Sequence, residues 1–498
     1  MSDYIHIPKT VKWQEVAKNN FSLSSSQYIQ LVMPNTNYKL VSDFLSRPLN
    51  RKDLGIEIGS LNYIDKSPYR FIRTKALQES SFLPDLNKET ALPIMPSEFV
   101  QMNLHEGDLL ISKDSNIGEI VILDKDYPNC MLSGAIYRLP VQAEWRYYLL
   151  AFIKHNIFRE QLDFMVPKGA TIRHAKTIFL DCKIPLPTKN VANVVRFISL
   201  LTQSIINKEK LIRQRHESIL QLIDKELAEN QKVGQFSYKL PRFADVTELN
   251  RVDTNMYRFY FQKEFFKIVN YHNGSKNIND LGFTMSRGQN LQVSNIGKSI
   301  YSDEKYSNFH TLVLPKFLSK YGTIDKVQYF GNQNSLKTLK EGDLIFGAEG
   351  FEKGRSIVVI EGKSKTITNI HGITIQQEEH NLLKAVFVKC FLDYLRSKGL
   401  IDLFAVGGNG GSLAQKYWTY IPFPNFSESK QKEIATLYHN PQDYKTKDFT
   451  LENFLEKDNE YNSMAGIYEL DKTAKYLKEK LNKAIDDIVN DREVATFF

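Results

Sequence analysis

A glycine-rich loop is the first feature of this sequence that suggests chemistry. The run Val406-Gly-Gly-Asn-Gly-Gly-Ser412 could present bare backbone N–H groups to a phosphate. A nucleotide-binding loop would end in Gly-Lys-Ser/Thr, and here Lys416 comes only after Ser412. Two interpretations stay open: a flexible turn between a helix and a strand, or a loop that contacts a DNA phosphate.

Signatures of catalysis are weak along the chain. Asn440-Pro-Gln-Asp443 superficially matches the Asn-Pro-Pro-aromatic loop of amino-group methyltransferases, but that loop needs a flat ring at its fourth position to stack a flipped base. No glycine-rich strand–turn–helix that would hold a methyl donor precedes it. His174 and His371 lack metal-binding neighbours at ligand spacing. We therefore expect a protein without catalytic, cofactor or metal residues of its own.

Two Gly-Asp pairs, Gly107-Asp108 and Gly342-Asp343, could suggest catalytic carboxylates. A single Asp beside a Gly and before a strand is more typical of a turn. We predict turns at both positions.

Lysines and arginines interleaved with aromatic and amide residues are the strongest candidates for binding. Such a set can neutralise phosphates and read bases, because Arg pairs with guanine while Asn and Gln pair with adenine. The predicted DNA contacts are Lys66, Arg70, Arg73, Lys75, Lys113, Lys168, Arg173, Lys176, Arg287, Gln289, Asn290, Lys298, Lys316, Lys320, Arg355 and Lys416.

An internal repeat indicates which elements position these residues. Landmarks recur in one order at nearly one spacing. They are Glu106–Ser112 and Glu341–Gly347, Ser133–Ile136 and His371–Thr374, apolar helical stretches at 145–164 and 382–404, glycine-bearing loops, and Ile184–Pro187 and Ile421–Pro424. We predict two tandem α+β domains, at 1–187 (with an N-terminal arm) and 235–424.

A long helix with a coiled-coil seam is predicted after each repeat. Residues 188–234 form the central spacer segment, whose helix, from 188 to about 228, would be about 60 Å long at 1.5 Å per residue. Residues 425–498 form the C-terminal spacer helix, with a looped insertion at 440–465. The two helices are expected to pair antiparallel, because each alone would expose an apolar stripe. The predicted seam is Val191, Val194, Ile198, Leu201, Ile205, Ile212, Ile219, Leu222, Ile467, Leu470, Leu477, Leu481 and Ile488.

Composition fits this organisation. The chain has 498 residues, 65 Lys+Arg against 57 Asp+Glu, a net charge of +8 and 42% hydrophobic residues. This length exceeds what one core usually supports. The absence of a signal sequence or a membrane span favours the cytoplasm. The 3 cysteines are far apart, which disfavours a disulfide framework.

These landmarks together resemble the specificity (S) subunits of type I restriction-modification systems, over about residues 15–498. The carrying segments are Glu106–Ile111, Glu341–Phe346, Ile117–Ile122, Gly134, Gly372, both Ile-Pro-x-Pro endings and Arg251–Tyr257. Two segments differ from the family pattern: Gly350–Gly354 replaces the usual Ile-Gly, and 440–465 interrupts the second spacer.

The resemblance implies two target-recognition domains, each reading one half of a bipartite DNA site, and helices that set the gap between the half-sites. It implies no activity in this chain, which would act in DNA modification and antiviral defence. Two methyltransferase (M) subunits would bind S-adenosylmethionine and methylate adenine, and nuclease/translocase (R) subunits could join. The alternatives are a stand-alone diverged DNA methyltransferase and a protein scaffold that does not bind DNA.

Overall fold

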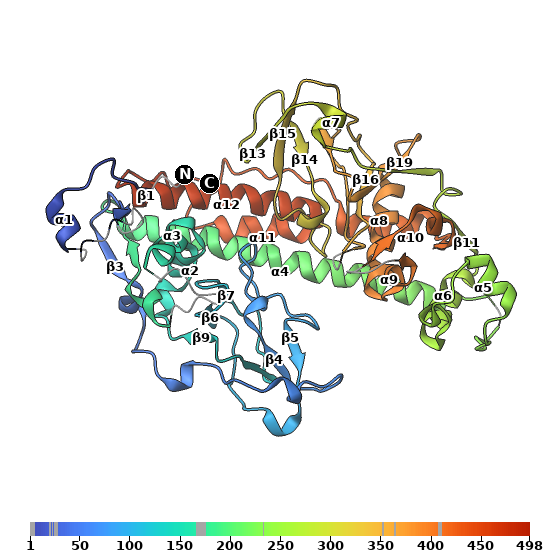
Figure 1. Ribbon diagram of the computed structural model, residues 1–498, viewed down its shortest axis with the longest axis horizontal. Helices are drawn as coiled ribbons and strands as arrows, with labels where there is room; N and C mark the ends of the chain where they lie inside the picture. The colour runs from blue at the N-terminus through green and yellow to red at the C-terminus, as the bar shows by residue number, and fades with distance from the viewer. Residues whose placement is uncertain are drawn as a thin grey trace. The chain divides into compact units, whose positions relative to one another are not determined.

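The computed structural model describes residues 5–18, 21, 23, 28–165, 176–232, 234–350, 353–362, 365–406 and 411–498 (Figure 1). Two predicted DNA contacts, Lys168 and Arg173, lie outside these ranges, as does most of the glycine-rich loop. The chain divides into two compact units. The first comprises Met1–Lys210, Asp443–Ser463 and Lys472–Phe498, and the second comprises Leu211–Gln442 and Met464–Asp471.

The first unit is built on two small sheets. In one sheet, β6 (Leu109–Ser112) lies between β7 (Ile120–Ile122) and β9 (Ile136–Leu139). In the other, β4 (Arg70–Ile72) pairs antiparallel with β5 (Ala91–Pro93) and parallel with β8 (Cys130–Leu132). The helices α2 (Arg146–Lys154) and α3 (Asn156–Met165) pack into the same core as β6.

The second unit repeats this plan. Here β16 (Leu344–Gly347) lies between β17 (Ser356–Val358) and β19 (Gly372–Gln377), with β12 (Phe283–Arg287) beyond β19. In its other sheet, β14 (His310–Leu312) pairs antiparallel with β15 (Gln328–Asn332) and parallel with β18 (Thr366–Ile367). The extra strand β13 (Ser299–Ser302) extends that sheet from β15. The helices α8 (Leu382–Ser397) and α9 (Leu400–Phe404) follow.

Strand register is the same in the two units. Leu109 pairs with Ile122 and Leu139, and Leu344 pairs with Val358 and Ile375. A short antiparallel pair of strands also recurs near the end of each unit. In the first unit, β3 (Tyr38–Leu40) pairs with β10 (Lys183–Pro185), and in the second, β11 (Ser275–Lys276) pairs with β22 (Phe423–Pro424). The duplication seen in the sequence is thus a duplication of topology.

Both predicted Gly-Asp turns form. Gly107 and Gly342 have φ of 86° and 84°, a region that glycine adopts without a steric penalty. The Asp108 carboxylate accepts the N–H of His105 at 2.9 Å, and the Asp343 carboxylate accepts the N–H of Lys340 at 2.8 Å. Both carboxylates therefore close turns, as the sequence predicted.

The spacer helices are α4 (Val191–Glu229) and α12 (Ile467–Val489), and each contributes residues to both units. In the first unit they run antiparallel, as predicted. Thr188 Oγ1, just before α4, donates to Asp491 Oδ1 at 2.9 Å, and Lys478 Nζ lies 2.9 Å from Glu209 Oε1. Figure 1 shows the later part of α12 alongside the first half of α4.

Most of the predicted seam is buried, with two exceptions. Val191 in the first turn of α4 is 43% exposed. The buried part of the seam begins one turn later, at Val194. Leu222 is only half-buried and Ile223 is buried instead. The cause is geometric: a straight helix has 3.6 residues per turn, so a strict seven-residue repeat drifts around its surface.

The segment predicted as a looped insertion is partly helical. After α10 (Glu428–Tyr438), an irregular stretch leads into α11 (Phe454–Met464). The prediction of a loop is wrong for α11. Its buried face includes Asp458 and Asn462, so the apolar periodicity that would reveal a helix is missing.

The other α-helices and strands are short. They are α1 (Trp13–Lys18), α5 (Phe243–Leu249), α6 (Phe259–Val269), α7 (Val293–Ile296), β1 (Ile5–His6), β2 (Gln30–Leu31), β20 (Ala405–Val406) and β21 (Ser412–Leu413). Within the described ranges, every helix is too short or too polar to span a bilayer.

Candidate nucleic-acid interface

The predicted DNA contacts that the structure describes fall into two groups by exposure. The exposed group is Lys66, Arg73, Lys75, Lys176, Arg287, Lys298, Lys316 and Lys416. The half-buried group is Arg70, Lys113, Gln289, Asn290, Lys320 and Arg355. An exposed cation can neutralise a phosphate directly, whereas each half-buried residue must be judged by its partners.

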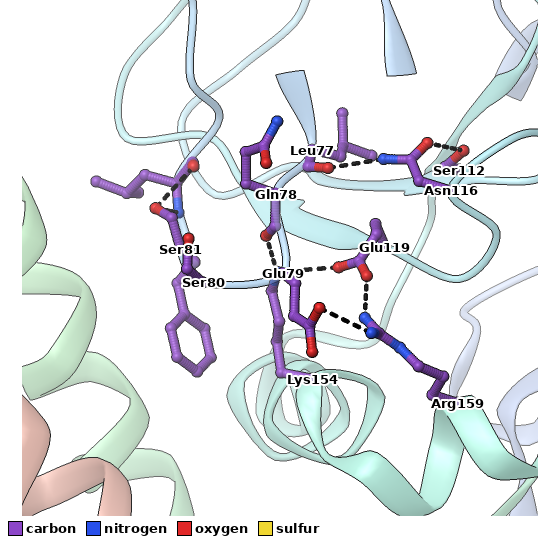
Figure 2. A network of polar contacts seen from close by, with 12 residues as sticks. Leu77, Gln78, Glu79, Ser80, Ser81, Ser112, Asn116, Glu119, Lys154 and Arg159 are labelled. Atoms are coloured by element: carbon purple, nitrogen blue, oxygen red, sulfur yellow. Dashed lines mark hydrogen bonds and ion pairs between the residues drawn. The ribbon is translucent and has the colours of Figure 1, made fainter. Parts of the chain in front are cut away.

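In the first unit, three of the predicted basic residues lie on β4 and in the turn after it. Arg70 lies on β4, and Arg73 and Lys75 follow at the surface. Asn116 holds this turn in place. Its Nδ2 donates to the carbonyl of Thr74 at 2.9 Å. It also donates to the carbonyl of Leu77 at 2.8 Å (Figure 2). The two exposed cations therefore stand on a fixed backbone, which is what a phosphate-positioning surface requires.

A partly buried acid–base network continues from this turn, with Lys154 and Glu119 inside and Glu79 at the surface. Lys154 Nζ on α2 donates to the carbonyl of Gln78 at 2.6 Å and lies 3.6 Å from Glu119 Oε2 (Figure 2). Arg159 on α3 pairs with Glu119 and also contacts Glu79 at 2.8 Å. Burial lowers the pKa of Lys154 to about 8, and burial raises the pKa of Glu119. The network joins the segment after Lys75 to both helices.

The same segment is tied to the spacer helices by Glu209 of α4. Its Oε2 accepts from Ser81 Oγ and from the backbone N–H of Phe82, both at 2.9 Å. Its Oε1 accepts from Lys478 of α12, which also donates to the carbonyl of Ser80 at 3.1 Å. One carboxylate thus connects the base of the basic turn to α4 and α12. Sequence reasoning missed Glu209, since a helical Glu at the edge of a seam looks like a solvated charge.

In the second unit, Arg287 ends β12 beside an acidic partner. Its Nη1 lies 3.0 Å from Glu349 Oε1 and donates to the carbonyl of Ile370 at 3.2 Å. His371 Nδ1 lies 2.7 Å from the other oxygen of Glu349. All three side chains are at least partly exposed. The cluster offers a guanidinium, an imidazole and a carboxylate at one end of the sheet, a set able to meet phosphate or base edges.

The two amide candidates lie in the loop that follows Arg287. Gln289 Oε1 accepts the N–H of Lys337 at 3.4 Å, and Asn290 Oδ1 accepts the N–H of Gln292 at 3.1 Å. Their oxygens support the loop, so base reading would depend on their NH₂ groups.

Two other candidates have structural partners. Arg355 Nη1 donates to the carbonyl of Leu318 at 2.8 Å, and Lys113 pairs with Asp114. Such contacts explain why both side chains are half-buried. Either side chain would have to give up its present partner in order to contact DNA.

Residues with possible catalytic roles are engaged elsewhere. Asn440, in the segment that matches part of a methyltransferase loop, donates its Nδ2 to the carbonyl of Met464 at 2.7 Å and its backbone N–H to Glu469 at 3.0 Å. The three cysteines are buried. Within the described ranges, no group of three or more His, Cys, Asp or Glu side chains could hold a metal ion.

No protein-family model and no curated protein matches this sequence. Several solved structures do match it, including the following three. The S subunit of a type I restriction-modification system from M. genitalium is 12% identical over 90% of this chain and 95% of its own, with a TM-score of 0.40. A chain from a structure of the assembly and conformational transition of a type I restriction-modification system is 11% identical over 94% of this chain and 100% of its own, with a TM-score of 0.29. The HsdS subunit from Thermoanaerobacter tengcongensis is 12% identical over 93% of this chain and 98% of its own, with a TM-score of 0.27. The chain is therefore similar to S subunits of type I restriction-modification systems.

Proposed function

We propose that this chain is the DNA-specificity subunit of a type I restriction-modification complex. One observation carries the proposal: the chain holds two copies of one strand topology in one register, and two long helices contribute to both. A duplicated reader suits a target with two half-sites, as paired readers do in dimeric DNA-binding proteins.

Each unit would read one half-site with its own surface. In the first unit, Arg73 and Lys75 would position the phosphates. In the second, Arg287 would do so, while Gln289 and Asn290 reach toward base edges. The spacer helices α4 and α12 would set the separation of the half-sites.

Catalysis would be supplied by partners. Two methyltransferase subunits would bind S-adenosylmethionine and methylate adenine, and nuclease/translocase subunits would join in restriction. The duplicated topology would suit two copies of one partner, because the same strand order recurs in the two units. The complex would act on double-stranded DNA in the cytoplasm.

The test is co-expression with a methyltransferase subunit encoded beside this chain, followed by genome-wide mapping of methylated adenines. We expect one bipartite motif with a fixed gap. Exchanging residues 15–187 for the corresponding unit of a related chain should change one half-site and leave the other unchanged. A change in both half-sites, or methylation by this chain without a partner, would overturn the proposal.

A second measurement separates DNA reading from a protein scaffold. Retention of DNA by the complex should weaken steeply as salt rises, because phosphate contacts release counterions. A complex that assembles but does not retain DNA at low salt would favour the scaffold.

A further inference from the structure

A buried lysine interrupts the apolar seam of α4. Lys208 is 0% exposed, and its Nζ lies 2.6 Å from Asp458 Oδ1 and 2.5 Å from Asn462 Oδ1, both on α11. The Asp458 side chain is almost as fully buried as the lysine. An ion pair taken this far out of water needs a specific reason, because desolvation can exceed the attraction between the charges.

The polar groups around this pair form a closed network. Asp458 Oδ2 accepts from Ser204 Oγ at 2.7 Å and from Asn462 Nδ2 at 2.9 Å. The hydroxyl of Tyr444 donates to Asp458 Oδ1 at 2.7 Å. The ammonium of Lys208 also lies 5.1 Å from the centre of the Tyr444 ring and 5.3 Å from that of Tyr461. The partners named here belong to the first unit, and each oxygen of Asp458 is satisfied.

This network fixes one alignment of α11 along α4. Sliding either helix by one turn, about 5.4 Å, would separate the buried ammonium from its carboxylate. A buried unpaired charge is strongly unfavourable, whereas apolar residues of similar size would pack in several alignments. A single polar residue in the seam of a coiled coil specifies register in the same way.

The two ends of the segment that carries α11, Asn440 and Gly466, are held close together by residues of the second unit. Glu469 Oε2 accepts the N–H groups of Asn440 at 3.0 Å and Gly466 at 3.1 Å. A Cβ on Gly466 would lie 2.7 Å from the carbonyl oxygen of Tyr438, so the backbones pass closely there. The chain therefore leaves at Asn440 and returns at Gly466 to nearly the same point. What lies between is an added element and not a necessary link between α10 and α12.

We propose that residues 443–463 are a register clamp on α4, in which the buried Lys208–Asp458 pair restricts the spacer to one alignment and so to one recognised gap between half-sites. The clamp rests on the proposed function for its biological effect, but the alignment itself can be measured without DNA.

The first experiment measures alignment in the full-length chain by cysteine cross-linking. Asn207 and Asn459 face each other, with Nδ2 and Oδ1 2.7 Å apart. The pair Asn207→Cys/Asn459→Cys reports the native alignment, and Gln203→Cys/Asn459→Cys reports a shift of one turn. With a short thiol-to-thiol cross-linker, only the native pair should react. In the background Lys208→Met/Asp458→Leu, the shifted pair should react at least tenfold more than before. A shifted pair that stays silent would overturn the clamp.

A charge-exchanged background provides the matched control. Lys208→Asp/Asp458→Lys keeps one cation and one carboxylate in the native alignment, so the shifted pair should stay silent there. If the apolar background fails to fold, Lys208→Met/Asp458→Asn serves in its place, since it removes both charges and keeps a polar side chain at position 458. Equal reaction of the shifted pair in all backgrounds, the unmodified one included, would also overturn the clamp.

The second experiment reads the recognised gap. Methylated adenines mapped for the complex with Lys208→Met/Asp458→Leu should include sites whose gap differs by about two base pairs, the span of one helical turn, in addition to the normal gap. A single normal gap would count against the clamp. If the unmodified complex shows no bipartite motif at all, the proposed function fails, while the cross-linking result still decides the clamp.

Discussion

Gly118 and Gly354 occupy the same place in the two sheets. Each donates its N–H to the carbonyl of the last residue of the central strand, Ser112 at 2.9 Å and Gly347 at 2.8 Å. Their φ angles are 80° and 86°. The family pattern seemed to break in the second unit because one extra residue precedes Gly354. In the structure, Gly354 donates in the second unit the hydrogen bond that Gly118 donates in the first unit.

Replacing either glycine by alanine should destabilise its unit. The positive φ costs about 1–3 kcal/mol for a residue with a Cβ. At Gly118 the new Cβ would also lie 2.4 Å from Leu162 Cδ1, so Gly118→Ala should lower the free energy of unfolding more than Gly354→Ala, where the nearest atoms are 3.0 Å away. Denaturant titration measures both. Gly59→Ala is the control, because Gly59 has φ −63° and one neighbour at 4.0 Å, and it should not destabilise the protein but raise its stability by up to about 1 kcal/mol.

Removing a predicted phosphate contact should change the salt dependence of DNA binding. Arg73→Ala should weaken binding by the assembled complex and reduce the slope of log K against log salt by about 0.9. Arg287→Ala should have a smaller effect, since Glu349 already neutralises part of that charge. Lys432→Ala on α10 serves as the control and should leave the slope unchanged. Equal slopes for all three variants and the unmodified complex would contradict this part of the interface.

The sequence revealed the repeat better than it revealed the contacts. Gly107, Gly342 and the apolar strand runs are local signals, and they predicted turns and strands correctly. Arg287 was singled out by its type, but its partner Glu349 was not, since pairing over such a sequence distance is set by the fold. Lys208 was visible as a charge in a seam, yet Asp458 lay in a segment interpreted as a loop. Local patterns do not encode such pairs.

Acidification should destabilise the first unit through His155. Burial lowers the pKa of this histidine below 6.5, and Asp486, with its Oδ1 3.5 Å from Nε2, only partly opposes that effect. Nδ1 accepts the N–H of Ile157 at 3.3 Å, which requires that nitrogen to be unprotonated. Between the folded pKa and about 6.5 the unfolded chain therefore binds more protons, so the free energy of unfolding rises with pH.

Urea titrations at pH 5.5 and 7.5 test this dependence. His155→Gln retains an acceptor without a titrating group and should flatten the rise in stability. Asp486→Asn removes the opposing charge and should steepen it. If His155→Gln and the unmodified protein change in parallel with pH, the titration of His155 does not contribute.

All three thiols should be unreactive in the folded protein. Burial raises the pKa of Cys130 to about 11 and those of Cys182 and Cys390 to about 12, so the reactive thiolate is scarce at pH 8. A colorimetric thiol reagent should report no accessible group in the native state and three after denaturation. Rapid reaction of one thiol in the native state would mean that its core opens readily.

Lengthening both spacer helices should lengthen the recognised gap. Four residues added to α4 and four to α12 extend each by about one turn, or roughly 6 Å at 1.5 Å per residue. A helical turn of DNA, 10–10.5 base pairs, spans about 34–36 Å, so the gap should grow by about two base pairs while both half-sites stay the same. Adding four residues to α4 alone is the control, and it should impair assembly because the paired seams no longer match. Methylated adenines at the original gap in the doubly extended variant would show that the helices do not set the distance.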